Sequence, residues 1–144
     1  MNDSEKLIKK LQMIPHPEGG HFKESYRDEN ISLIYYLLRK NEKSHWHRLT
    51  KNEILHFYQG DPLSVYISKD GKTSITKVLG QNIDRNQYMH LVVNADNWFS
   101  METKGEFSFI GCAVAPAFDY ADFELASQHW KPEKNDQVKL RKIR

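Results

Sequence analysis

Hydrophobic and polar positions alternate in short runs along most of the chain. From residue 21 to residue 115 these runs are rich in β-branched and aromatic residues and recur at intervals of about ten residues. Such spacing is typical of an all-β sandwich or barrel, and it predicts eight or nine antiparallel strands. The runs are HFKESYRD (21–28), SLIYYLL (32–38), SHWHRL (44–49), EILHFYQ (53–59), LSVYIS (63–68), TSITKVL (73–79), QYMHLVV (87–93), WFSMET (98–103) and FSFIGCAVA (107–115).

The segments between and before these runs carry helix and turn signals. Asp70 and Gly71 stand between two runs and predict a tight type I′ hairpin, because both residue types tolerate positive φ. Near the N-terminus, Ser4 is a suitable cap for one short amphipathic helix that ends before Pro15. The following IPHPEGG stretch (14–20) combines two prolines with two glycines and predicts a sharply shaped loop.

Length and charge limit the classes of protein that remain. The 144 residues suit one domain, which we place at 1–130, followed by a basic tail at 131–144. The tail holds six basic residues against two acidic ones, and we interpret it as a solvated end in preference to a nucleic-acid site. The sequence has no long apolar span and no secretory signal at its start, so a cytoplasmic protein without membrane contact is expected.

The strongest chemical signal is a pair of histidines followed by a glutamate. In a regular strand His45 and His47 point to the same face, and pairing of their run with the next one would bring Glu53 beside them. Two imidazoles and a carboxylate suit a divalent metal such as Zn, Fe, Mn or Ni and leave coordination positions open. A purely structural polar cluster is the alternative.

Three other residues with possible chemistry receive structural interpretations. Cys112 lies in an apolar run and is expected to be a buried, inert thiol. His56 lies three residues after Glu53 and should therefore face away from it in a regular strand. His90 is better explained as a core histidine than as a missing metal ligand.

His45, His47, Glu53 and Gly60 together resemble the first motif of the cupin superfamily. The resemblance implies a double-stranded β-helix, or jelly-roll barrel, in which the two histidines and the glutamate bind a metal. The second cupin motif usually supplies a fourth histidine ligand, and Phe99 stands at that place here.

A more specific resemblance covers nearly the whole chain, from HPEGG (16–20) through SHWHR, NEILHFYQG and NWF to GCAVAPAFDYADFELA. These segments resemble a small single-domain cupin branch of unknown function that is similar to the RmlC-like deoxysugar epimerases. The resemblance implies a ligand pocket at the barrel mouth and a homodimer. Residues expected to contact the ligand are Glu18, Tyr36, Phe57, Phe99 and Phe118.

Three functions follow as hypotheses. The first is a metal-dependent isomerase, epimerase or oxygenase that acts on a carbohydrate-like compound, with His47 and Glu53 as catalytic residues. The second keeps the pocket without a metal, with a histidine as general base beside a carboxylate. The third is a non-catalytic module that binds or senses a metabolite.

Overall fold

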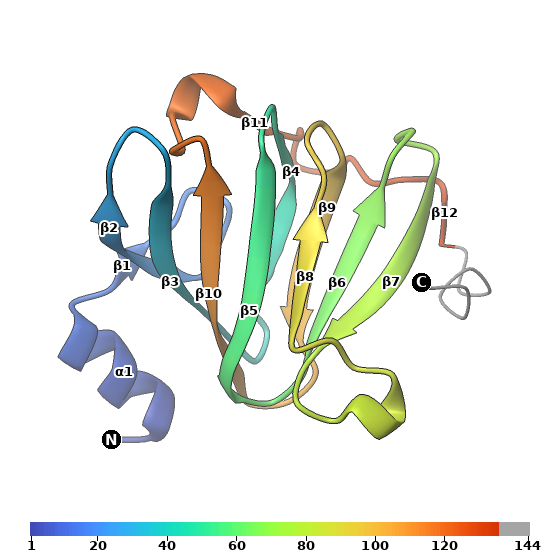
Figure 1. Ribbon diagram of the computed structural model, residues 1–144. Helices are drawn as coiled ribbons and strands as arrows, with labels where there is room; N and C mark the ends of the chain where they lie inside the picture. Colours follow the sequence, from blue (N-terminus) through green and yellow to red (C-terminus); the bar gives the residue numbers. More distant parts are fainter. Residues whose placement is uncertain (136–144) are drawn as a thin grey trace.

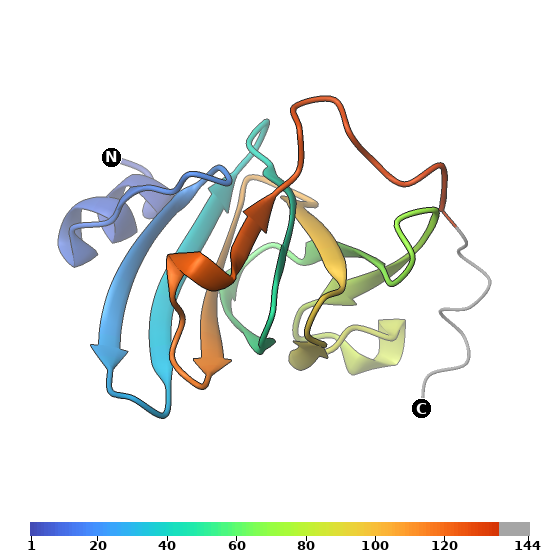
Figure 2. The same cartoon turned by 90° about the horizontal axis from the view of Figure 1, so that it is seen from above.

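The computed structural model describes residues 1–135, which form two facing six-stranded sheets with a short helix on the outside (Figures 1 and 2). The first sheet has the order β1 (Ile14–Pro15), β2 (His21–Arg27), β3 (Ser32–Arg39), β10 (Phe107–Ala115), β5 (Asn52–Gly60) and β8 (His90–Val93). The second has the order β11 (Phe123–Leu125), β4 (Ser44–Leu49), β9 (Trp98–Thr103), β6 (Leu63–Ser68), β7 (Thr73–Leu79) and β12 (Lys134–Asn135). The predicted all-β jelly roll with an N-terminal helix is confirmed.

Strand bounds follow the sequence runs closely, because alternation of apolar and polar residues is a direct consequence of one face being buried. The run at 87–93 is the main exception, since only His90–Val93 forms strand β8. The residues before it follow the 3₁₀ helix η1 (Ile83–Arg85), and the Tyr88 N–H donates to the Val78 carbonyl of β7. Those residues therefore belong to a connection between the two sheets.

The expected hairpin between the runs at 44–49 and 53–59 does not form. Strand β4 pairs with β9 and β11 in one sheet, whereas β5 pairs with β10 and β8 in the other. The connection between the two strands thus crosses from one sheet to the other, as in a jelly roll. Glu53 reaches the histidine strand across the barrel interior, not along a ladder.

The β6–β7 hairpin forms, but its turn is not type I′. Gly71 has a φ of 74°, whereas Asp70 does not have positive φ. The Asp70 carboxylate instead accepts hydrogen bonds from the backbone N–H groups of Lys72 and Thr73, at 2.8 and 2.9 Å. An aspartate that bonds to the backbone ahead of it closes the loop, so a longer turn replaces the two-residue one.

Helix α1 (Asp3–Leu11) begins two residues earlier than expected. Asn2 is its cap, and Asn2 and Glu5 form a capping box, while Ser4 lies inside the helix and is buried. The helix ends at Leu11 with Gln12 in the left-handed conformation, well before Pro15. Its apolar side chains pack against Leu37 and Phe109 on the outer face of the first sheet.

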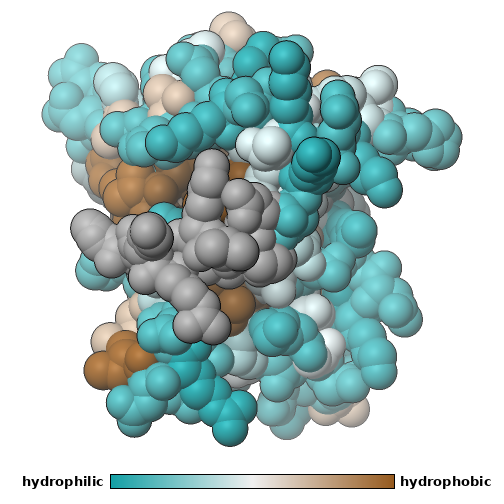
Figure 3. All heavy atoms as spheres, turned by 90° about the vertical axis from the view of Figure 1, so that its right-hand side faces the viewer, coloured by the Kyte–Doolittle hydropathy of each residue, from teal (hydrophilic) through white to brown (hydrophobic). Residues whose placement is uncertain are grey.

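Residues 134–135, within the segment predicted as a basic tail, form strand β12. Strand β12 pairs in parallel with β7, and the Asn135 side chain donates to the hydroxyl groups of Ser74 and Thr76. Pro132 is buried. Figure 3 shows this side of the molecule as mostly hydrophilic, with separate hydrophobic patches. The remainder of the basic tail, 136–144, lies outside the described residues.

The main core fills the space between the two sheets. Fully buried members come from both layers, with Tyr36, Leu55 and Ile110 on the first sheet and Val65 and Phe99 on the second. This packing closes one part of the barrel interior and leaves the other part open. Within residues 1–135, no helix is long and apolar enough to span a membrane.

Candidate functional site

A cavity of about 270 Å³ lies between the two sheets. Its walls combine apolar and aromatic side chains with a few titratable groups, which is the usual composition of a small-molecule site. The lining residues are His16, Glu18, Phe22, Glu24, Arg27, Ser32, Ile34, Tyr36, His47, Leu49, Glu53, Met101, Cys112, Val114, Phe118, Tyr120 and Phe123. The cavity therefore gathers residues from β2, β3, β4, β5, β9, β10 and β11, together with the loop before β2 and the segment between β10 and β11.

His47 is buried, with 2% of its surface exposed. Its Nδ1 lies 2.7 Å from the His45 carbonyl oxygen, which can only accept, so Nδ1 carries a hydrogen. This bond directs Nε2 into the cavity, where it lies 3.3 Å from Glu18 Oε1. The ring packs on Phe99, with 4.1 Å between ring centroids.

His45 does not join the cluster. The pairing of β4 with β9 shifts register between Ser44 and His47, so that both of these residues are buried. A bulge of this kind inserts an extra residue and breaks strict alternation. His45 consequently leaves the cavity, and its Nε2 lies 2.9 Å from the Ser127 carbonyl oxygen. The expectation that His45 and His47 share a face is wrong for this reason.

Glu18 occupies the centre of the site through the fold of the HPEGG loop. Gly19 has a φ of 115°, and a Cβ there would overlap the Lys43 carbonyl oxygen, so glycine is required. The loop places the Glu18 carboxylate in the cavity, where Ser44 Oγ donates to Oε2. The Tyr36 hydroxyl, from strand β3, donates to the Gly19 carbonyl and holds the loop in place.

His16 is a site residue that sequence reasoning missed, although it begins the HPEGG motif. Its Nδ1 accepts a hydrogen bond from the Glu18 backbone N–H at 3.1 Å and lies 3.5 Å from Glu18 Oε1. Burial lowers the pKa of His16; Glu18 opposes this effect, and the neighbouring His47 reinforces it. Both the bond to Nδ1 and the lowered pKa favour a neutral imidazole.

Glu53 is 8% exposed and lines the opposite wall. Burial, with a further contribution from the charge of Glu18, raises its pKa to about 8, although a hydrogen bond with Cys112 acts in the other direction. Glu53 therefore holds a proton at neutral pH. The pKa of the Cys112 thiol is raised well above its usual value, mainly by burial, which agrees with an inert thiol.

The predicted ligand contacts divide into two groups. Glu18, Tyr36 and Phe118 line the cavity, whereas Phe57 and Phe99 do not. Phe99 is 1% exposed and supports the His47 ring from the core side. Phe57 packs at the edge of the main core.

His56 and His90 also lie outside the cavity. They are cross-strand neighbours on β5 and β8, with 5.8 Å between ring centroids. Neither imidazole is therefore available to complete a ligand set with His47.

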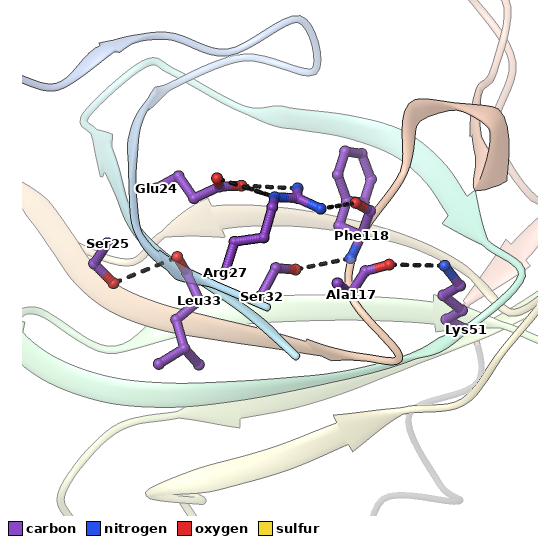
Figure 4. Close-up of polar contacts among 8 residues, drawn as sticks. All are labelled: Glu24, Ser25, Arg27, Ser32, Leu33, Lys51, Ala117 and Phe118. Carbon is purple, nitrogen blue, oxygen red and sulfur yellow. Dashed lines mark hydrogen bonds and ion pairs between the residues drawn. The ribbon is translucent and has the colours of Figure 1, made fainter. Parts of the chain in front are cut away.

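The mouth of the cavity is covered by the segment that follows β10. Figure 4 shows three side chains holding its backbone: Arg27 Nη1 donates to the Phe118 carbonyl, Ser32 Oγ accepts from the Phe118 N–H, and Lys51 Nζ donates to the Ala117 carbonyl. Lys51 also forms an ion pair with Asp122, at 2.6 Å, in the 3₁₀ helix η2 (Tyr120–Asp122). We call residues 117–123 the roof.

The roof presents three aromatic rings to the cavity, from Phe118, Tyr120 and Phe123. The rings meet edge to face, with centroids 4.9 to 6.2 Å apart. This geometry is the favourable one for aromatic pairs and makes the roof a rigid apolar cover. A ligand in the cavity is therefore enclosed between aromatic rings and the polar cluster.

The residues present do not form the metal centre that the sequence predicted. His45 has left the cavity, and among residues 1–135 no three His, Cys, Asp or Glu side chains come together in a way that suits a metal ion. The His16 Nδ1 lone pair already accepts the Glu18 N–H. What the geometry does bring together is the His47–Glu18 pair and the buried carboxyl group of Glu53, which keeps its proton at neutral pH.

Comparison with known protein families assigns the fold. The family model described as "Cupin superfamily (DUF985)" matches residues 5–126. The chain belongs to this cupin family. A search of curated proteins found no match to the sequence.

Solved structures agree with this assignment. A protein from Shewanella oneidensis is 35% identical, with a TM-score of 0.85 over 89% of this chain and 87% of that one. A hypothetical protein from Leishmania major is 28% identical, with a TM-score of 0.81 over 90% of both chains. A Bacillus subtilis oxalate decarboxylase variant is 12% identical, with a TM-score of 0.63 over 78% of this chain and 29% of that one, and shares the fold alone.

Proposed function

We propose that this cupin binds a small oxygenated compound and catalyses proton transfer on it, as an isomerase or epimerase that needs no metal. The observation that supports this most strongly is the contrast between the two sides of the cavity. The His47–Glu18 pair presents a proton acceptor, and Glu53 holds a proton at neutral pH. In acid–base catalysis, the environments of two titratable groups usually differ so that one group keeps its proton while the other can accept one.

The chemistry assigned to these residues is proton abstraction beside a carbonyl group. The His47–Glu18 pair takes a proton from the carbon next to the carbonyl, and its C–H electron pair moves into a carbon–carbon double bond. Glu53 donates its proton to the carbonyl oxygen, which leaves a neutral enol. In the second step the His47–Glu18 pair returns a proton to carbon, and the enol O–H returns its proton to Glu53. The result is an isomerisation or an epimerisation without net change in charge.

The surroundings support this chemistry. The His45 carbonyl fixes the tautomer of His47, and Ser44 orients the Glu18 carboxylate. The aromatic roof limits the access of water, which strengthens the electrostatic interactions inside the cavity. A volume of about 270 Å³ is suited to a compound of single-ring size.

The test is exchange of carbon-bound hydrogen with solvent deuterium. Untagged protein is incubated in D₂O with small aldoses, ketoses and 2-oxo acids, in the presence and absence of EDTA, and proton NMR follows loss of the C–H signal. We expect exchange of at least one compound with EDTA present, and losses of about 10²-fold or more in His47→Ala and Glu18→Gln. Tyr58→Phe, on the outer face, is the matched control and should retain the wild-type rate.

Two outcomes would replace this proposal. The first is stoichiometric Zn, Fe, Mn or Ni in the wild-type protein that disappears in His47→Ala and Glu53→Ala, together with exchange that EDTA abolishes; this result would restore the metal-dependent hypothesis. The second is a compound that stabilises the protein strongly against heat but never exchanges, which would select the binding or sensing module.

A homodimer is a separate part of the proposal. On the outer face of the first sheet, register places Leu33, Ala113, Ile54 and Val92 side by side across four strands. Leu33 and Val92 are 36% and 45% exposed. An apolar row on a sheet face is a suitable contact for a second copy. Sedimentation equilibrium should give a dimer for the wild type and a monomer for Val92→Glu; a wild-type monomer would contradict this part.

A further inference from the structure

Arg27 lines the mouth of the cavity and has bonding capacity that the protein does not use. Its Nε–H and one Nη2–H bond to the Glu24 carboxylate, and one Nη1–H bonds to the Phe118 carbonyl. A guanidinium group has five N–H donors. One N–H on each terminal nitrogen therefore has no partner among residues 1–135, and the side chain is 43% exposed.

These two unused N–H groups, one on each terminal nitrogen, can donate to oxygens of a carboxylate or phosphate. The Glu24 carboxylate already binds the same guanidinium, through Nε and Nη2, with contacts of 2.8 to 3.2 Å. The position of Arg27 is fixed as well, because its bond to the Phe118 carbonyl, at 2.7 Å, attaches it to the roof. A fixed guanidinium loses less entropy when it binds an anion.

We propose that Arg27 binds a carboxylate group of the substrate at the cavity mouth, so that the substrate is a small oxygenated carboxylic acid. This inference rests on the proposed function, since it assigns the end of the substrate opposite to the reacting carbon. The carboxylate accepts from the unused N–H groups of Arg27, and the oxygenated carbon reaches the floor between Glu53 and the His47–Glu18 pair.

The charges that line the cavity are consistent with this orientation. Glu18 repels an anion from the floor, so the carboxylate is directed to the mouth, where the cation lies. Glu24, in direct contact, and the nearby Asp119 reduce the positive field of Arg27 but leave two of its N–H groups unused. Removal of the Glu24 charge should therefore tighten binding of an acid, whereas removal of Arg27 should abolish the preference for an acid.

The experiment compares acids with their neutral amides, which have nearly the same shape. The probes are pyruvate with pyruvamide, lactate with lactamide, and D-glucuronate with D-glucuronamide, and dissociation constants are measured by calorimetry or NMR titration at constant ionic strength. We expect at least one acid to bind about 10-fold or more tightly than its amide, as for a charge-assisted hydrogen-bonded pair. If no acid binds more tightly than its amide, the proposal is overturned.

Variants locate the preference. Arg27→Gln should bind the acid and the amide equally, and Arg27→Lys should retain part of the preference because it keeps the charge without the guanidinium. Glu24→Gln should strengthen it. Ser32→Ala removes the Phe118 N–H bond but keeps the Glu24 contacts of Arg27, so it should weaken the acid and the amide to about the same extent. An acid preference that survives in Arg27→Gln refutes the assignment.

The result is separable from the test of the proposed function. Selective binding of an acid through Arg27, without any exchange of carbon-bound hydrogen in D₂O, would contradict the acid–base chemistry and leave the carboxylate site standing. Exchange of neutral sugars that is insensitive to Arg27→Gln would leave the chemistry standing and contradict the carboxylate site.

Discussion

Replacement of Glu53 by glutamine should change how the stability of the protein depends on pH. Burial and the Glu18 charge raise the pKa of Glu53 from 4.5 to about 8, so the folded state keeps a proton that the unfolded chain releases. Below about pH 4.5 both states hold the proton, and Glu53 has no effect. Between about 4.5 and 8 the free energy of unfolding should fall as pH rises, and above this range the loss should be complete.

The magnitude follows from the size of the pKa shift. A change from 4.5 to about 8 corresponds to an upper limit of roughly 5 kcal/mol, at 1.36 kcal/mol per pKa unit. Relaxation of the cavity around the charge should reduce this value, and we expect about 2–4 kcal/mol. Glutamine has the shape of the protonated acid and does not ionise, so Glu53→Gln should remove the whole pH-dependent term.

The assay is urea unfolding at pH 5 and pH 8.5. At pH 5 the wild type and Glu53→Gln should differ little, whereas at pH 8.5 the variant should be more stable, with a midpoint about 1–2 M urea higher. Glu29→Gln, an exposed position, is the matched control and should shift equally at both pH values. Parallel stabilities of the wild type and Glu53→Gln across this range would refute the assignment of a buried proton to Glu53.

Three further predictions concern the loop, the thiol and the C-terminal strand. Gly19→Ala should lower the free energy of unfolding by about 2–4 kcal/mol in urea melts, since the residue has positive φ and faces the Lys43 carbonyl; an unchanged midpoint would contradict the strained loop. Cys112 should resist iodoacetamide at pH 8 in the folded protein and react readily after unfolding; rapid labelling of the folded state would refute its burial. A chain ending at Trp130 should be about 1–2 kcal/mol less stable than one ending at Asn135, through loss of β12; equal melting temperatures would show that β12 contributes nothing.

Much of the fold could be read from the sequence because strand signals are local. Alternation along SLIYYLL, LSVYIS and FSFIGCAVA requires only that one face of each strand be buried, and these runs became β3, β6 and β10. The prolines and glycines of IPHPEGG indicated a sharply shaped loop, which the structure forms with Gly19 close to the Lys43 carbonyl. The presence of His47 and Glu53 at one cavity was also within reach of the sequence, through the cupin motif.

What the sequence could not decide depends on register and on contacts between distant segments. Strict alternation puts His45 beside His47, and only the bulge in β4, formed against β9, turns His45 away. His16 and Arg27 reach the cavity because the first sheet faces β4 across the barrel, and nothing in the local pattern records which strands face one another. The protonation of Glu53 is likewise a tertiary property, because it arises from burial beside Glu18, a residue far away in the chain.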